Sequence, residues 1–197
     1  ETSLGTINNI NKIGQLLKEN NIEFIVDAIS SFGGIPIDMA ASNIDYIVGS
    51  SNKCLHSYPG LSFVVANRSK LKKNKTSKSL SLHLYEQWKA FEENDQFRYT
   101  PPVQMITALN EAINELYDEG GVEARYKKYC SMNTILKQKM RQIDMHPIVA
   151  SEDQGPILMA FDYPSHDFSY KELYNRLKNK HNIIIYTAEY QGREVLR

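Results

Sequence analysis

Two short apolar runs, each leading to a charged side chain, constrain the fold of this chain more than any other feature. The first run ends at Asp27, and the second, residues 44–48, leads through two serines and an asparagine to Lys53. Both have the length of a buried strand, and a third run over residues 61–66 follows a Pro-Gly turn. Strands separated by helices or short loops are typical of an α/β fold. If the first two strands are neighbours, an acid and an amine meet at the carboxyl edge of the sheet, where such folds bind ligands.

The other apolar residues recur at spacings that indicate both helices and strands. A helical spacing predicts an amphipathic helix over residues 6–20, and Thr6 can cap its start. Paired prolines at 101–102 and paired glycines at 120–121 delimit a long helix between them. The same patterns predict further helices over 82–93, 122–143 and 169–180, and further strands over 156–162 and 183–187.

The overall charge gives no reason to expect a polyanionic partner. Lysine plus arginine number 23 and aspartate plus glutamate also number 23, so no net field draws the chain to nucleic acid or to an anionic membrane. No apolar run approaches the roughly 20 residues of a membrane span. Five lysines gather in residues 67–78, and we predict a solvated surface loop there, because no aromatic residues alternate with the lysines.

Cysteine and histidine residues indicate neither a disulfide framework nor a metal site. Cys54 and Cys130 lie far apart in the sequence, which fits a reducing cytoplasm, and the five histidines do not cluster at metal-ligand spacings. The nucleophile elbow, the P-loop and the dinucleotide-binding glycine motif do not occur, so acyl transfer and nucleotide hydrolysis lack support. The chain begins without methionine and stops after a strand-like stretch, so we expect it to be part of a longer protein.

Asp27 and Lys53 together have the chemistry that pyridoxal phosphate requires. A lysine amine forms a Schiff base with this cofactor, and a carboxylate keeps the pyridine nitrogen protonated so that the ring can accept electrons. A lone lysine after an apolar strand is usually an exposed surface residue, and it is the acid at the neighbouring strand end that favours catalysis. Serines at positions 30, 31, 50 and 51 could donate hydrogen bonds to a phosphate.

The segments around these residues resemble the class V, fold-type I aminotransferases. The resemblance is carried by residues 24–36, by Ser-Ser-Asn-Lys-Cys at 50–54 and by Pro-Gly at 59–60. Three further segments are similar to the branch of this family that acts on phosphonates, namely residues 1–2, 79–88 and 98–102. The resemblance extends essentially from end to end of the chain.

This resemblance implies a role for each of several residues around pyridoxal phosphate. Lys53 would be the Schiff-base lysine, and Asp27 would be the partner of the pyridinium nitrogen. Thr2 would hydrogen-bond the cofactor ring substituent, Ile29 would pack on the ring face, and Asn52 would lie near the phosphate.

The resemblance also implies a shared site and a pair of small-molecule substrates. Thr100 would reach the phosphate of the neighbouring subunit's cofactor, which implies a homodimer. Arg197 would bind the substrate carboxylate through a bidentate contact, and Arg193 is a rival for this role because it lies only four residues earlier. The implied reaction converts 2-aminoethylphosphonate and pyruvate to phosphonoacetaldehyde and alanine in the cytoplasm.

The resemblance implies an α/β fold with three parts. Residues 1–100 would be the C-terminal part of a large domain with a mainly parallel sheet, 101–121 a linking helix, and 122–197 a small, truncated α+β C-terminal domain. The family places its phosphate-holding loop and its stacking aromatic residue before Glu1, so this chain should be inactive alone. Other readings stay open: another substrate pair, such as alanine with glyoxylate or serine with pyruvate, a non-catalytic fragment of this fold, or a nucleic-acid-binding module that uses the lysines.

Overall fold

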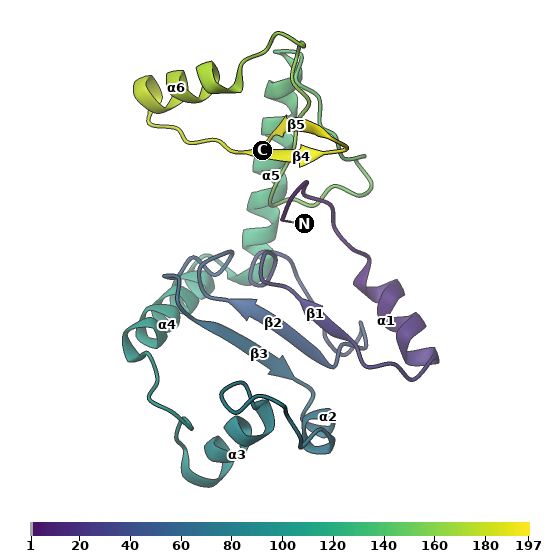
Figure 1. The fold of residues 1–197 in the computed structure, drawn as a ribbon, viewed down its shortest axis with the longest axis vertical. Coiled ribbons are helices and arrows are strands. Elements are labelled where there is room, and N and C mark those ends of the chain that lie inside the picture. Colours follow the sequence, from purple (N-terminus) through teal and green to yellow (C-terminus); the bar gives the residue numbers. More distant parts are fainter. Residues whose placement is uncertain (1) are drawn as a thin grey trace. The chain divides into compact units, whose positions relative to one another are not determined.

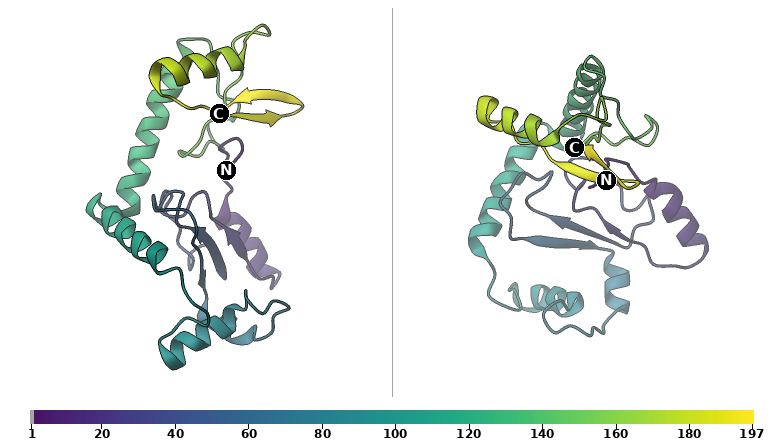
Figure 2. Two further views of the ribbon diagram at one scale, coloured as in Figure 1. Left: turned by 60° about the vertical axis from the view of Figure 1, so that its left-hand side comes forward. Right: turned by 45° about the horizontal axis from the view of Figure 1, so that its top comes forward.

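The computed structural model describes residues 2–197, so Glu1 of the opening motif lies outside the described residues. The chain divides into two compact units. One consists of Asn9–Gly121, and the other combines residues 2–8 with Val122–Arg197. Figures 1 and 2 show their elements, which are described below one unit at a time.

A three-stranded mixed sheet forms the centre of the Asn9–Gly121 unit. Its strands are β1 (Ile25–Asp27), β2 (Tyr46–Ser50) and β3 (Ser62–Ala66), in the order β1-β2-β3. β1 pairs with β2 in parallel, and β2 pairs with β3 in antiparallel fashion. The α/β class and the parallel neighbours at the two apolar runs agree with the sequence-based expectation, and β3 makes the sheet mixed.

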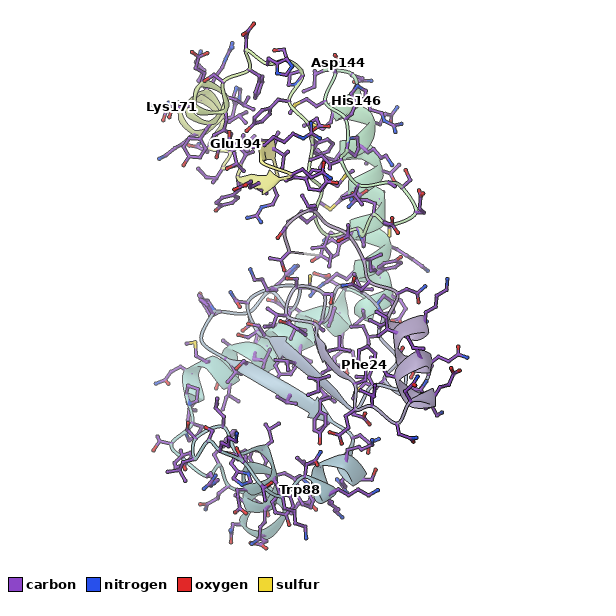
Figure 3. All side chains as sticks on the ribbon, turned by 45° about the vertical axis from the view of Figure 1, so that its right-hand side comes forward. Phe24, Trp88, Asp144, His146, Lys171 and Glu194 are labelled. Atoms are coloured by element: carbon purple, nitrogen blue, oxygen red, sulfur yellow. The ribbon has the colours of Figure 1, made fainter. Side chains whose placement is uncertain are left out.

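Helix α1 (Ile10–Glu19) covers the core beside this sheet. The core consists of Phe24, Ala28, Ile44 and Ile47, and Figure 3 shows Phe24 between the sheet and α1. Asn9 caps the helix, because its side chain accepts a hydrogen bond from the backbone N–H of Lys12. The prediction of Thr6 as the cap is therefore wrong.

Three further helices complete this unit: α2 (Arg68–Lys73), α3 (Leu84–Asn94) and α4 (Val103–Asp118). Helix α2 corrects the expectation of a loop over residues 67–78. The Asn67 side chain caps it by accepting from two backbone N–H groups, and Leu71 is buried. Helices α2 and α3 are neighbours, with Lys72 Nζ 5.3 Å from the centroid of the Trp88 ring.

The second unit contains α5 (Gly121–Arg141), α6 (Tyr170–His181) and a hairpin of β4 (Thr187–Tyr190) and β5 (Arg193–Leu196). Its core consists of Met145, Met159, Phe161 and Leu196.

Two predicted strands are wrong in this unit. Residues 156–162 form no strand, and Phe161 makes only isolated bridges to Pro147 and Leu196. The predicted strand over 183–187 is shifted as well, because Ile183 and Ile184 are exposed and pairing begins at Thr187.

Within residues 2–197, none of the helices is both long and apolar enough to cross a membrane.

Candidate active site

Asp27 and Lys53 follow two adjacent parallel strands. Asp27 is the last residue of β1 and stands opposite Val48 of β2. Strand β2 continues to Ser50, and Lys53 comes three residues later. Since parallel strands end at the same edge of a sheet, the acid and the amine both belong to the carboxyl edge.

The loops that follow these two strands pack against each other. The Ala28 N–H donates to the Val48 carbonyl at 2.9 Å and so extends the ladder by one residue. Beyond it, the buried Cys54 thiol donates to the Ser30 carbonyl at 3.3 Å. Gly33, at φ +88°, lies so close to Leu55 that an added Cβ would come within 2.6 Å of its side chain. These contacts hold the loop that follows Asp27 beside the loop that contains Lys53.

Both charged side chains are exposed in this chain, which leaves them accessible to a ligand. One oxygen of the Asp27 carboxylate, Oδ1, accepts the backbone N–H of Ile29 at 2.9 Å. This contact fixes the turn after β1 and the orientation of the carboxylate. Ile29 itself is half-buried next to it.

Ser50 and Ser51, in the loop that contains Lys53, form hydrogen bonds within that loop. Ser51 is fully buried, and its hydroxyl meets the carbonyl oxygens of Tyr58 at 2.6 Å and Leu61 at 3.1 Å. The Ser50 hydroxyl donates to Asn52 Oδ1 at 2.6 Å. Because its one hydroxyl proton is used in this way, Ser51 is not a phosphate donor, contrary to the sequence-based suggestion.

Thr100 lies in the loop between α3 and α4 and is exposed. The residues before it are tied to other parts of the same unit. The Arg98 guanidinium donates to the Leu80 carbonyl at 3.0 Å, and the Arg98 backbone N–H donates to the Gln87 side chain at 3.3 Å. Both bonds are made by Arg98, so the chain is anchored two residues before Thr100.

Thr2 and Arg197, from opposite ends of the chain, meet in the second unit. Arg197 Nη1 donates to the Thr2 carbonyl oxygen at 2.9 Å. The Arg197 backbone is held by Tyr186 through two hydrogen bonds of 2.8 and 3.1 Å. Arg193 instead forms an ion pair with Asp162, with 2.9 Å between Nη1 and Oδ1. Arg193 therefore already has a carboxylate partner within the chain.

A hydrogen bond joins Tyr163 to the β4–β5 hairpin in the same unit. The Tyr163 hydroxyl donates to Glu194 of β5, which is labelled in Figure 3, at 2.7 Å. Burial, and then the bond to Glu194, raise the pKa of Tyr163 well above its usual value. Burial is also the main cause that raises the pKa of Tyr170, whose hydroxyl donates to the Ile185 carbonyl. Both phenols therefore stay neutral donors at physiological pH.

Comparison with known proteins identifies the family of this chain. The family described as aminotransferase class-V matches residues 1–195. The chain belongs to the class-V aminotransferase family. The sequence-based resemblance to this family is thereby confirmed.

Several relatives of the class-V chain carry one name. It is 38% identical over 199 residues to a 2-aminoethylphosphonate–pyruvate transaminase of Phocaeicola vulgatus, with all of this chain and 55% of the relative covered. It is 43% identical over 191 residues to the protein of the same name from Bacillus mycoides, with 96% and 52% covered. The chain thus spans about half the length of the curated relatives that it matches.

Solved structures of aminotransferases share the fold. An alanine–glyoxylate aminotransferase from Nostoc sp. superposes with a TM-score of 0.86 at 23% identity, over all of this chain and 53% of that one. An aspartate aminotransferase from Thermus thermophilus gives a TM-score of 0.87 at 20% identity, over 100% and 55% of the two chains. These likenesses establish the α/β fold of fold-type I aminotransferases.

Within each unit the structure also shows contacts that no local sequence pattern indicates. Cys54 meets Ser30 in one unit, and Arg197 meets Thr2 in the other. In the second unit the Gln154 amide bonds to three carbonyl groups, again without a local signal. No group of three or more metal-binding side chains occurs among residues 2–197.

Proposed function

We propose that the full-length protein containing this chain is a pyridoxal-phosphate-dependent aminotransferase. It would convert 2-aminoethylphosphonate and pyruvate to phosphonoacetaldehyde and alanine. The single observation that carries the proposal is the placement of Asp27 and Lys53 at the ends of two paired parallel strands. The name shared by relatives at 38% and 43% identity supports the substrate pair.

The residues present fit the proposed cofactor by their chemistry. A carboxylate and a primary amine emerge from one sheet edge, and both are accessible. They are the two groups needed to protonate a pyridine nitrogen and to bond an aldehyde carbon. Pyridoxal phosphate, when bound, supplies an electron sink for the electrons released at the substrate carbon.

Lys53 and Asp27 would have different chemical roles. The Lys53 amine would hold the cofactor through its aldehyde group. In its free form, Lys53 Nζ would take the proton from the amine-bearing carbon of the substrate. The Asp27 carboxylate holds the proton on the ring nitrogen, and the Ile29 N–H keeps that carboxylate oriented.

The remaining residues would bind and orient. We assign Thr2 to the ring substituent, Ile29 to the ring face and Asn52 to the neighbourhood of the phosphate. Thr100 would contact the phosphate in the partner subunit of a homodimer. Arg197 would hold the pyruvate carboxylate by a bidentate contact, and its rival Arg193 is engaged by Asp162.

For the organisation of the chain we propose a large-domain part over residues 1–100, a linking helix over 101–121 and a small C-terminal domain over 122–197. The change of unit between Gly121 and Val122 supports the last boundary. We also propose a cytoplasmic location and small molecules as the only substrates.

Amino-donor profiling of the purified full-length protein with pyridoxal phosphate tests the proposed function. The expected result is the highest kcat/KM with 2-aminoethylphosphonate and pyruvate, compared with alanine plus glyoxylate and serine plus pyruvate. A higher value with either alternative pair would replace the proposed substrates. Cofactor binding without turnover of any pair would indicate a non-catalytic member of the family.

A further inference from the structure

The side-chain amide of Gln154 binds three backbone carbonyl groups. Its Nε2 atom lies 2.7 Å from the Leu158 oxygen, 2.8 Å from the Gly155 oxygen and 3.1 Å from the Gly5 oxygen. The Oε1 atom is buried and has no hydrogen-bond partner among the described residues. The three carbonyl oxygens are all acceptors, so the atom that lies among them must be a donor. The Gln154 side chain is therefore oriented with its Nε2 atom, and not Oε1, toward the three carbonyl groups.

These bonds hold residues 2–8, the N-terminal strap, against the loop 153–161. Backbone bonds reinforce the attachment: the Ile7 N–H donates to the Asp153 carbonyl at 2.8 Å, and the Gly155 N–H donates to the Gly5 carbonyl at 2.7 Å. The approach at Gly5 is very close, since an added Cβ would lie 1.9 Å from the Leu158 oxygen. The strap is thus attached to this loop at several points between Gly5 and Ile7.

The same loop also holds the strand that leads to Arg197. Phe161, at its end, exchanges two backbone hydrogen bonds with Leu196, of 2.8 and 3.0 Å. Arg197 is the next residue, and its guanidinium donates to the Thr2 carbonyl of the strap. The loop 153–161 therefore sets the position of Thr2 relative to Arg197, with Gln154 at one end and Phe161 at the other.

We propose that Gln154 is a positioning residue for substrate carboxylate binding. By closing the strap, its amide places the Thr2 carbonyl where it accepts one N–H of Arg197, which orients the other N–H groups of the guanidinium toward a carboxylate. The proposal rests on the proposed function, because it takes Arg197 as the carboxylate-binding residue. It adds that the affinity for pyruvate depends on a residue that does not touch the substrate.

Gln154→Glu tests the proposal with almost no change in shape. It replaces the Nε2 donor with a carboxylate oxygen that faces three carbonyl oxygens, so the strap should open. Gln138→Glu, at an exposed position of α5, is the matched control for the same chemical change. Hydrogen exchange of the full-length protein should show faster exchange of the Ile7 and Gly155 amides in Gln154→Glu alone.

Steady-state kinetics then test whether opening of the strap changes KM for pyruvate through Arg197. In Gln154→Glu, KM for pyruvate should rise about tenfold, the effect of one lost hydrogen-bonding partner, with kcat changed less than twofold. In an Arg197→Gln background the same substitution should add less than about twofold, because positioning residues and the group that they position are coupled. A purely structural role would give equal effects in both backgrounds and would overturn the proposal.

A second route protects the test against a variant that does not fold. Gly5→Ala opens the strap from its other side, and Gly192→Ala is its control, because Gly192 also has positive φ (+75°) but nothing within 4 Å of an added Cβ. Gly5→Ala should reproduce the rise in KM for pyruvate, and Gly192→Ala should not.

The two proposals fail in different ways. Failure of the proposed function would appear in the wild-type protein, which would not turn over pyruvate. With a normal wild type, a strap that opens while KM for pyruvate stays within twofold would overturn the role of Gln154, and so would a strap that stays closed in Gln154→Glu.

Discussion

Arg193 and Arg197 lie at opposite ends of β5, and their substitutions should differ in their effect on pyruvate binding. Arg193 is half-exposed and pairs with Asp162, which is also partly exposed. Such a solvent-accessible ion pair contributes about 0.2–1 kcal/mol to folding. Arg193→Gln should therefore lower the free energy of unfolding by at most about 1 kcal/mol and leave KM for pyruvate within about twofold.

Arg197→Gln removes the charge that we assign to the substrate carboxylate. Hydrogen bonds to a charged group contribute about 1.5–3 kcal/mol each. Losing one such contribution corresponds to a rise of about 10- to 150-fold in KM for pyruvate. The backbone bonds between Arg197 and Tyr186 do not depend on the side chain, so the fold should persist.

The assay is the pyruvate half-reaction of the two full-length variants, measured with circular dichroism as a check on folding. Arg197→Gln should show the large rise in KM and Arg193→Gln should not. The reverse pattern, a large rise in Arg193→Gln with Arg197→Gln near the wild type, would refute the assignment.

Three further predictions follow from particular contacts. Ile47 is 1% exposed, so Ile47→Ala should lower the free energy of unfolding in urea by about 2–5 kcal/mol. Ile25 is 63% exposed, and Ile25→Ala should lower it by under about 1 kcal/mol. Equal losses would contradict the placement of Ile47 in the core. Asp27→Asn keeps an acceptor for the neighbouring amide and should leave stability unchanged while lowering kcat about 10²- to 10³-fold; unchanged kcat would contradict its role. Because the pKa of Tyr163 is raised on folding, its contribution to stability is complete below about pH 10 and falls as pH rises above that value. Tyr163→Phe should therefore lose less stability than the wild type as the pH rises from about 9.5 to 11.5 in chemical denaturation, and parallel losses would contradict the shift.

The sequence predicted the elements whose patterns are local. Strands β1 and β2 are short apolar runs, and α4 lies between a proline pair and a glycine pair. The signals for α2 were present but outweighed by its lysines: an asparagine that caps its start and one buried leucine. Lysines in the last turn of so short a helix stabilise it through the helix dipole.

The wrong predictions in the second unit come from pairing between distant residues. Phe161 meets Leu196, 35 residues later, and neither local sequence indicates the other. The β4–β5 hairpin could have been found from Gln191-Gly192, because both residues adopt positive φ in a two-residue turn. The apolar run that includes Ile183 predicts a strand instead, but the Ile183 side chain is exposed.

The candidate site was predictable where it follows from strand order. Asp27 and Lys53 end two successive apolar runs, and parallel pairing brings these ends to one edge. The contact of Arg197 with Thr2 depends on the folding of the whole second unit, so only the structure could reveal it.

Locating the lysine that bonds the cofactor tests the role of Lys53 directly. The full-length protein is incubated with pyridoxal phosphate, reduced with borohydride and digested for peptide mass spectrometry. We expect a pyridoxyl phosphate adduct on the peptide that contains Lys53. The adduct should be absent in Lys53→Arg and retained in Lys12→Arg, a control at an exposed position of α1. A stoichiometric adduct on another lysine, or none on any, would rule out Lys53 as the Schiff-base lysine.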